Sequence, residues 1–425
     1  MPPIRFIHAA DLHLDAAFSG LSRDIPAEFA ERLRTATFTA FRRLLDLCER
    51  ESPDFLLLAG DVYNQEDASV SAQLALRDGF RRLESLSIPV FLVHGNHDPL
   101  ASRLRSVRWP GNVTVFGELP DAVPVFRKGE GTPLAIIHGA SHASGRETRN
   151  LAALFRRTEA CGLHVGLLHS TPGDADGVAR YAPFSQEDLK ASGMDYWALG
   201  HIHDRREVCR EPLAAYPGCT QGLHINEPGE KGCLLVTAEA RPDGGYAVRT
   251  SFRPLGPAVW KTLDMDLGGA ASLDELENRL RTGLDRAVAE VWSGCEMLLV
   301  RLRLQGRTEL DGLLRKGTTC AELADRLRED GSGVPRIWIK DIDVATRPCV
   351  ERGALLERED LLGEVFRLSE AARTASRLQA LREGPLAPLF AHARAGKALE
   401  PLTDEELARL LDDAESLCLD LLEND

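Results

Sequence analysis

Several absences in the sequence limit what the protein can be. No run approaches the roughly 18 consecutive apolar residues of a transmembrane helix. The N-terminus, Met1-Pro2-Pro3-Ile4-Arg5, has no apolar signal-peptide core. The nine cysteines form no C-x-x-C pair, which excludes a zinc ribbon or a thioredoxin-like site and indicates reduced thiols. We therefore expect a soluble, cytoplasmic protein.

The chain also lacks an excess of positive charge. Its 425 residues carry a net charge of −14, which argues against nucleic-acid binding through bulk charge alone. Residues 351–425 hold 17 acidic and 9 basic side chains, so the acid excess is concentrated in the tail and a local basic patch can lie elsewhere. With 44% hydrophobic and 27% charged residues the chain is typical of globular proteins, and its length fits about three domains.

Residues 1–253 alternate short apolar runs with helical patterns. Near-continuous apolar runs predict a sheet that is buried on both faces. Strands are expected at residues 4–8, 55–58, 90–93, 134–137, 165–168 and 196–199, and helices near residues 27–50, 70–86, 147–160 and 185–191. This pattern predicts an α/β domain over residues 1–253.

The segment Pro254–Pro257 is typical of a linker, and residues 254–350 predict a small α/β domain. Its strands are expected at residues 260–267, 297–304 and 337–344. A capping box at residues 272–275 opens a helix whose apolar face holds Leu276, Leu280, Leu284, Val288 and Val291.

Residues 351–425 predict an acidic helical region. One apolar stripe is expected to hold Leu361, Val365, Leu368 and Ala372. A capping box at residues 403–406 precedes a seam with coiled-coil spacing, formed by Leu407, Leu411, Ala414, Cys418 and Leu421. The seam favours two interpretations equally, a helix folded onto its own domain or a helix that docks a partner.

The residues suited to catalysis each follow one of the predicted strands. The five segments are Asp11-Leu12-His13, Gly60-Asp61, Gly95-Asn96-His97-Asp98, His169 and Gly200-His201-Ile202-His203. Loops at the carboxyl ends of strands converge on one crevice in open α/β sheets. Oxygen and imidazole donors without thiolate suit manganese, iron or zinc. So many donors suit two metals about 3.5–4 Å apart that share a carboxylate, an arrangement that hydrolyses phosphoesters.

This ordered set resembles the calcineurin-like metallophosphoesterase superfamily. Within it, His8–Asp15 (H-A-A-D-L-H-L-D), Asp195–His203 and Tyr216–Gly232 are similar to the bacterial DNA-repair exonucleases of the SbcD/YhaO type. The motifs cover residues 4–236. The resemblance implies a four-layer α/β/β/α sandwich, then a small α/β capping domain and a helical C-terminal region. It also implies a manganese-dependent DNA exonuclease or endonuclease with a coiled-coil ABC-type ATPase partner of the SbcC/YhaN type.

The resemblance implies a role for each motif residue. Asp11, His13 and His203 would bind one metal, and Asn96, His169 and His201 the other. Asp61 would bridge both metals together with a water or hydroxide. His97 would contact the phosphate and protonate the leaving oxygen as general acid. The metals would be two Mn²⁺ ions, with iron or zinc as alternatives, and a homodimer is possible for the family.

Some residues depart from the family pattern or carry a second interpretation. The segment Gly60–Gln65 lacks the Arg and second Asp of phosphoprotein phosphatases, and Asn64 stands where many SbcD-type sequences have an acid. His142 and Asp98 are second candidates for the site. Phosphate contacts are one interpretation of six arginines, and a solvated helix face is the other: Arg77, Arg81, Arg82, Arg103, Arg105 and Arg108.

Two other functions stay open from the sequence. A small-molecule phosphodiesterase, for instance one acting on cyclic nucleotides, uses the same motifs, but usually forms one compact domain. A non-catalytic scaffold that holds an ATPase on DNA has no chemical use for His97. We therefore expect a metal-dependent phosphodiesterase that acts on DNA.

Overall fold

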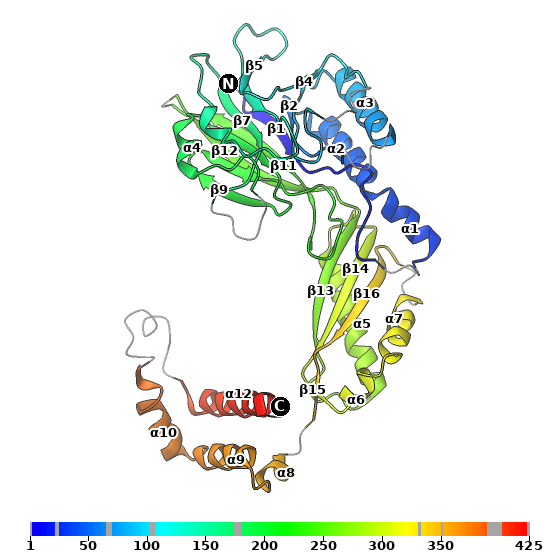
Figure 1. Cartoon of the computed structure of the whole chain (residues 1–425), viewed down its shortest axis with the longest axis vertical. Helices are drawn as coiled ribbons and strands as arrows, with labels where there is room; N and C mark the ends of the chain where they lie inside the picture. Colours follow the sequence, from blue (N-terminus) through cyan, green and yellow to red (C-terminus); the bar gives the residue numbers. More distant parts are fainter. Residues whose placement is uncertain are drawn as a thin grey trace. The chain divides into compact units, whose positions relative to one another are not determined.

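The computed structural model describes residues 2–21, 25–64, 70–101, 107–173, 180–242, 244–329, 333–349, 352–388 and 402–422. Two six-stranded sheets pack face to face (Figure 1). The first has the order β12-β11-β1-β2-β3-β4, with β1 Ile4–Ala9, β2 Phe55–Ala59, β3 Val90–Val93, β4 Val113–Val115, β11 Gly232–Ala240 and β12 Tyr246–Pro254. The second has the order β5-β6-β7-β8-β10-β9, with β5 Asp121–Val125, β6 Ala135–Ala140, β7 Leu163–His169, β8 Tyr196–Gly200, β9 Arg206–Arg210 and β10 Leu213–Tyr216.

The alternation of side chains along β2 shows how the layers form. Phe55 and Leu57 belong to the core between the two sheets, together with apolar side chains of β6, β7 and β8. Leu56 and Leu58 point the other way, into a core with helices α2 (Ala36–Glu51) and α3 (Val70–Ser85). Successive side chains of a strand face opposite sides, so a strand buried on both faces is apolar throughout.

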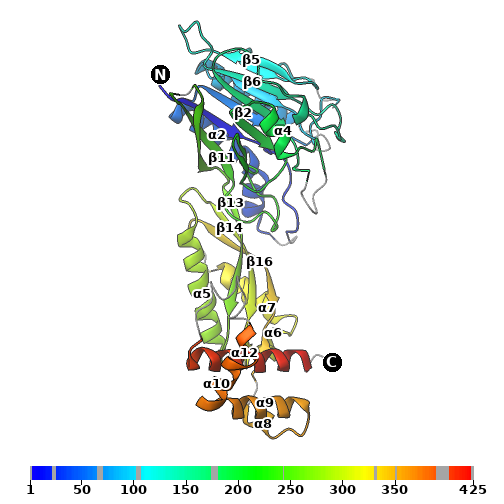
Figure 2. The ribbon, with the colours of Figure 1, turned by 90° about the vertical axis from the view of Figure 1, so that its left-hand side faces the viewer.

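The outer face of the second sheet is covered in the same way. Trp197 and Leu199 of β8 pack in a third core with Phe155 and with Leu189 of α4 (Gln186–Ala191). The short 3₁₀ helix η1 (Ala152–Leu154) adds Ala152. The order of layers is therefore helix, sheet, sheet, helix, and the predicted four-layer α/β/β/α sandwich is confirmed (Figure 2).

Two of the predicted helices differ from the structure. The helix expected near residues 27–50 is two helices, α1 (Ala27–Arg34) and α2, separated at Thr35. The break lets Phe29 and Leu33 pack against β13, β14 and β16, whereas α2 packs against the first sheet. The helix expected near residues 147–160 is wrong, because only η1 forms there.

A three-stranded sheet of β13 (Ala258–Asp266), β14 (Met297–Gln305) and β16 (Arg336–Val344) follows the sandwich. The predicted helix here is α5 (Leu273–Glu290), with Leu276, Leu280 and Leu284 buried as expected. The remaining elements of this part are α7 (Thr319–Glu329), α6 (Asp311–Leu314), and the short paired strands β15 (Arg307–Thr308) and β17 (Arg347–Pro348).

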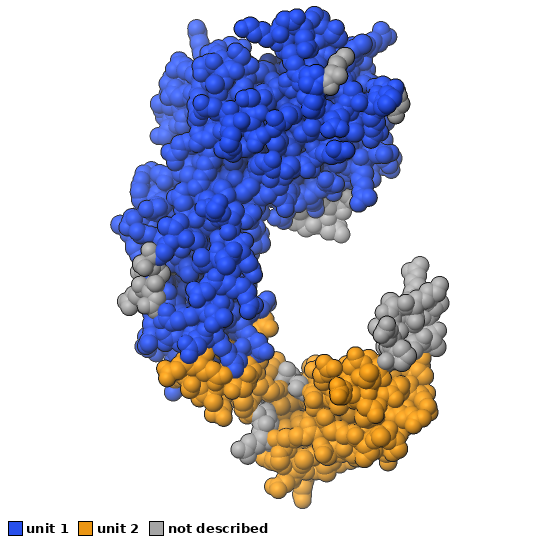
Figure 3. Space-filling view, turned by 180° about the vertical axis from the view of Figure 1, so that it is seen from behind, with its two compact units in different colours: residues 1–266, 277–304, 314–345 blue, residues 267–276, 305–313, 346–425 orange. Residues whose placement is uncertain are grey.

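Contacts divide the chain into two compact units, residues 1–266, 277–304 and 314–345, and residues 267–276, 305–313 and 346–425 (Figure 3). The expected domains 1–253, 254–350 and 351–425 stay predictions. Within the described residues, no helix has both the length and the apolar character needed to cross a membrane.

The C-terminal helices are α8 (Arg352–Leu356), α9 (Leu361–Ala372), α10 (Ala375–Glu383) and α12 (Asp404–Leu422). The apolar stripe expected on α9 is not the face that packs against other helices, because Leu361 and Leu368 are 65% and 61% exposed. The packed face holds Leu362 and Phe366, which form a core with Leu355 and Leu419. On α12 Leu407 is buried as expected, but Ala414 and Leu421 are exposed.

Candidate metal centre

Three strands of the first sheet and two strands of the second end at one edge of the sandwich. β1 pairs in parallel with β2, β2 with β3, and β7 with β8. Asp11, Asp61 and Asn96 follow the first three strands, and His169 and His201 stand at the ends of β7 and β8. The two sheets are tied at this edge, because the His201 N–H lies 3.1 Å from both carboxylate oxygens of Asp11 and donates to them.

The backbone at this edge is held in conformations that residues other than glycine seldom adopt. Four non-glycine residues have a positive φ, namely Asp11 (50°), His13 (40°), Asp61 (49°) and His201 (101°). Such strain costs energy and concentrates at functional sites. The backbone at Gly95 also lies very close to the Asp61 side chain, because a Cβ atom on Gly95 would lie 2.3 Å from Asp61 Oδ1.

One group of candidate ligands is formed by Asp11, His13 and His203, whose ligand atoms all lie within 4.8 Å of one another. His13 Nδ1 donates to Asn64 Oδ1 at 2.7 Å, and His203 Nδ1 donates to Glu227 Oε1 at 2.5 Å. Each ring therefore presents its Nε2 atom to the other, and the two Nε2 atoms lie 3.1 Å apart. Two ring nitrogens this close share either a proton or a metal cation.

The second group is formed by Asp61, His169 and His201, again within 4.8 Å. His169 Nδ1 donates to a backbone carbonyl, so its Nε2 atom is the one that faces the other candidate ligands. This Nε2 atom faces Asn96 Oδ1 at 3.0 Å and Asp61 Oδ2 at 3.3 Å, and Asn96 Oδ1 is also 3.1 Å from His201 Nδ1. Asp61 Oδ2 is 4.0 Å from His13 Nε2, so this carboxylate reaches both groups.

The electrostatics of the two groups also fit divalent cations. Burial lowers the pKa of His169, but Asp61 and Asp11 outweigh it and raise the pKa to about 9. Burial lowers the pKa of His201 to about 3, so this imidazole is neutral at neutral pH. Its Nε2 atom is buried without a hydrogen-bond partner in the described structure. Carboxylate, amide oxygen and imidazole nitrogen form a donor set that suits manganese, iron or zinc.

His97 lies beside both groups without joining either. Its backbone N–H donates to Asp61 Oδ1 at 2.9 Å, and its ring is 5.1 Å from the ring of His13. The side chain is exposed, unlike the buried His13 and His169. An exposed imidazole next to the centre is placed to contact a phosphate and to deliver a proton.

The structure thus brings together all eight residues predicted for the site, and their roles stay predictions. His142 and Asp98 belong to neither group. His142 Nε2 donates to the His169 carbonyl at 2.6 Å. Asp98 accepts from the Val62 and Gly95 N–H groups at 2.9 and 2.7 Å, so it fixes the turns that carry Asp61 and Asn96.

Two residues orient candidate ligands: the sequence analysis named Asn64 only as a departure from the family pattern, and it missed Glu227. Asn64 provides the oxygen for His13 that an acid would provide in many SbcD-type sequences. Glu227 accepts from His203, and its other oxygen accepts from the Leu223 N–H at 2.6 Å. Cys219 lies within ligand distance of His203 and Glu227, but burial raises the pKa of its thiol, which stays protonated. The sequence did offer a signal for Glu227, because this carboxylate lies in Tyr216–Gly232, a segment that matched the family pattern.

The predicted arginine contacts lie elsewhere. Arg77 and Arg81 pair with Asp78, and Arg82 pairs with Asp46 at 2.7 Å, all on the outer helical layer. Arg108 is exposed, and Arg103 and Arg105 lie outside the described residues. A solvated helix face therefore accounts for the arginines of α3.

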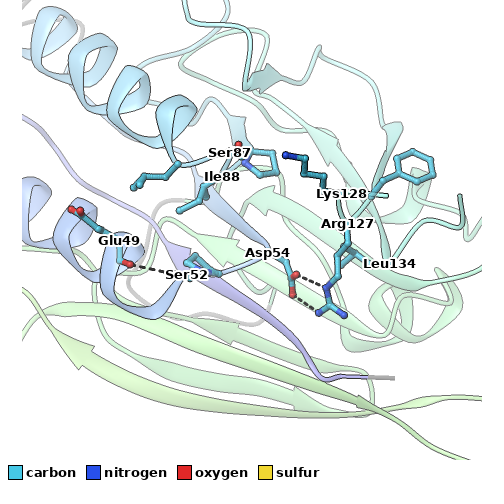
Figure 4. A pocket seen from close by; sticks show the side chains of 12 residues that line it. Glu49, Ser52, Asp54, Ser87, Ile88, Arg127, Lys128 and Leu134 are labelled. Carbon is cyan, nitrogen blue, oxygen red and sulfur yellow. Dashed lines mark hydrogen bonds and ion pairs between the residues drawn. The ribbon is translucent and has the colours of Figure 1, made fainter. Parts of the chain in front are cut away.

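A separate hollow of about 250 Å³ lies where β2 and β3 begin, the edge opposite to the candidate ligands (Figure 4). Arg127 donates to both carboxylate oxygens of Asp54 there, at 2.8 and 2.9 Å. None of the eight predicted site residues lines this hollow.

Comparisons with known proteins agree with this geometry. Residues 4–205 match the calcineurin-like phosphoesterase family, and residues 260–347 match the middle domain of the metallophosphoesterase YhaO. YhaO of Bacillus subtilis (strain 168) is 35% identical over 392 residues, which cover 90% of this chain and 91% of the relative. The DNA double-strand break repair protein Mre11 of Aeropyrum pernix is 28% identical over 313 residues, covering 68% and 69%.

Fold, site and relatives define one class of protein, an enzyme that hydrolyses phosphodiester bonds with divalent metals. The chain belongs to the calcineurin-like metallophosphoesterase family. Within that family it is similar to YhaO over nearly its whole length, the middle domain included.

Proposed function

We propose that this chain is a manganese-dependent DNA nuclease of the SbcD/YhaO type that acts in DNA repair. The observation that carries the proposal is the convergence of carboxylate, amide and imidazole ligand atoms in two groups that Asp61 joins. The name and the coverage of the Mre11 relatives support DNA as the substrate.

The ligand roles follow from the two groups. Asp11, His13 and His203 would hold one cation, and Asn96, His169 and His201 the other, with Asp61 shared. The chemistry that two divalent cations supply at such a centre is neutralisation of phosphoryl charge and activation of an attacking water. Oxygen and nitrogen donors suit manganese, iron and zinc equally. We propose manganese among them because of the family resemblance.

His97 completes the proposed reaction. Its exposed imidazole would donate a proton to the oxygen that leaves phosphorus, because a departing alkoxide needs a proton donor. The hydrogen bond from its backbone to Asp61 Oδ1 fixes its place relative to the shared carboxylate.

A coiled-coil ABC-type ATPase is the partner that we propose for the helical tail. The described part of the tail exposes six large apolar side chains in addition to those it buries: Leu361, Leu368, Leu410, Leu417, Leu421 and Leu422. Exposed leucines on two helices are suited to a helical partner. A homodimer stays a prediction.

The proposal is tested with purified protein and added Mn²⁺, on labelled linear DNA and on bis-p-nitrophenyl phosphate. We expect the wild type to degrade DNA and Asp61→Ala to lose all hydrolysis. His97→Ala should lose hydrolysis with its metal content unchanged, because the His97 side chain supplies no atom to either group of candidate ligands. Cleavage of the small ester alone, with and without the ATPase, would instead indicate a small-molecule phosphodiesterase. A wild type inert on both would indicate a scaffold.

A further inference from the structure

Four exposed arginines lie at the same edge of the sandwich as the candidate ligands. They are Arg146, Arg180, Arg205 and Arg206. Many arginines of this domain are paired with acids, as Arg82 is with Asp46. Among the described residues, none of the four has a carboxylate within ion-pair distance. Their charge is therefore available to an anion from solution.

Two of these arginines flank the second group of ligands. β6 runs parallel to β7 and ends at the same edge, and Arg146 lies in the loop that follows it. This loop touches the Asn96 turn, because a Cβ atom on Gly145 would lie 3.2 Å from the Asn96 carbonyl oxygen. Arg180 precedes Tyr181, whose ring lies 5.1 Å from the ring of His201.

The other two flank the first group, two and three residues after His203. The Arg205 guanidinium carbon lies 3.9 Å from the centre of the Phe252 ring, and that of Arg206 lies 5.7 Å from the Tyr216 ring. Stacking on a ring holds a guanidinium in place and leaves its N–H groups free to donate. The Tyr216 hydroxyl donates to the carbonyl of Ser170, the residue after His169, so this pair adjoins the centre.

Arg205 and Arg206 also line a hollow of about 360 Å³. Tyr216 and Phe252 form apolar parts of its wall, and Glu207 is the acidic residue that lines it. The Glu207 carboxylate accepts a long hydrogen bond of 3.5 Å from the Thr250 hydroxyl. The hollow thus holds two cations against one anion, an excess that favours a phosphate.

The order of strands places the two pairs on opposite flanks. In the sheet, β7 and β8, which carry His169 and His201, lie between β6 on one side and β10 and β9 on the other. Arg146 therefore stands on the β6 flank, and Arg205 and Arg206 stand on the β9 flank. The segment of Arg180 joins the β6 flank, because the Ala182 N–H donates to the Glu147 carbonyl in the loop after β6. A strand of nucleic acid that crosses the centre would meet cations both before and after the phosphate that is cleaved.

We propose that these four arginines, the arginine rim, bind backbone phosphates on both sides of the scissile phosphodiester. This inference rests on the proposed nuclease function and adds how the substrate is held. A nucleic-acid strand carries a phosphate for every nucleotide, so each flank has a charge to bind. A small phosphodiester has a single phosphate and gains nothing from the rim.

The test uses the full chain and three variants. Arg205→Ala/Arg206→Ala and Arg146→Ala/Arg180→Ala each remove one flank. Arg210→Ala is the matched control, because Arg210 is exposed and unpaired in the described structure and lies at the other end of the same strand, opposite Leu213 instead of Tyr216. Binding of labelled linear DNA is measured by fluorescence anisotropy with EDTA over a range of salt. kcat/KM with Mn²⁺ is measured on the DNA and on bis-p-nitrophenyl phosphate.

We expect each double variant to lower the slope of log K against log salt by about 2, because each phosphate contact contributes about 1. DNA affinity at moderate salt should fall by roughly tenfold or more. Turnover of the small ester should change less than twofold in either double variant, and Arg210→Ala should match the wild type in every assay.

Two results would overturn the arginine rim while leaving the nuclease intact. In the first, both double variants bind and cleave DNA as the wild type does. In the second, Arg210→Ala loses as much affinity as they do, which would indicate bulk charge. A wild type that cleaves only the small ester and binds no DNA would overturn the nuclease proposal itself, and the rim with it.

Discussion

At the scale of single residues, the centre depends on which nitrogen of each imidazole carries the proton. Asn64, Glu227 and a backbone carbonyl accept from the Nδ1 atoms of His13, His203 and His169. Each acceptor occupies the Nδ1 side of its ring, so Nε2 is the nitrogen that the ring presents to a cation. Partners of this kind orient metal ligands and raise their basicity.

Glu227 should therefore control metal affinity without touching the metal. We expect Glu227→Ala to weaken Mn²⁺ binding by about 10- to 100-fold, because His203 loses the acceptor that orients it. Glu227→Gln keeps an oxygen at this position and should recover part of the affinity. Isothermal titration of the metal-free protein measures both. Glu239→Gln, on an exposed part of β11, is the control, and an unchanged affinity in Glu227→Ala would remove the positioning role.

Metal binding should also depend on pH. In the metal-free protein the pKa of His169 is raised to about 9, so the ring is protonated at neutral pH and its proton must leave before a cation binds. We expect the affinity for Mn²⁺ to rise as pH increases towards 9, by roughly tenfold per unit for one displaced proton. Calorimetry in buffers of different ionisation enthalpy counts the released protons. A Mn²⁺ affinity that stays constant over about two pH units, from pH 6.5 to 8.5, would contradict the displacement of a proton from His169.

The motif residues could be predicted from sequence, whereas the residues that orient them could not. Asp11, Asp61, Asn96 and His201 follow strands and His169 ends one, and parallel strands deliver their ends to one edge. The bond between Glu227 and His203 joins two loops outside that regular arrangement. Strand periodicity carries no information on such a contact.

At the scale of elements, the sequence predicted strands better than short helices. The pattern at residues 147–160 suggested a helix, but Phe155 adopts an extended conformation with ψ of 137°. Its ring packs 4.8 Å from that of Trp197. The free energy of burying a large ring exceeds a small difference in helix propensity. On α9 both faces are apolar, so the pattern did not decide between Leu361 and Leu362.

Helix α12 offers two leucines that should separate folding from partner binding. Leu417 is 58% exposed, and Leu419 is 3% exposed in the core with Phe366. We expect Leu419→Ala to destabilise this unit by about 2–5 kcal/mol, because it leaves a cavity. Leu417→Ala should leave thermal unfolding unchanged and weaken capture of the coiled-coil segment of the ATPase. Equal capture by Leu417→Ala, Leu421→Ala and the wild type would argue against this face.

At the scale of the whole molecule, the metal centre is built on a sandwich whose three cores contain none of the candidate ligands. We expect the protein to stay folded when EDTA removes its metals, with an unchanged far-UV circular dichroism spectrum. The free energy of unfolding should fall only by the stabilisation that metal binding gives the folded state. This is about 2.7 kcal/mol for a metal present at 100 times its Kd. Loss of secondary structure on chelation would show that the metals hold the fold together.

The ties between the ligand-bearing turns have a further consequence. The His201 N–H bonds to Asp11, and Asp98 joins the turns after β2 and β3, so the cavity keeps its shape without help from an ion. Oxygen and nitrogen donors suit manganese, iron and zinc alike, so metal availability contributes to which ion is bound. The ion that a cell places there is then decided by the local supply, and protein purified from media rich in manganese, iron or zinc should carry different ions in the same fold.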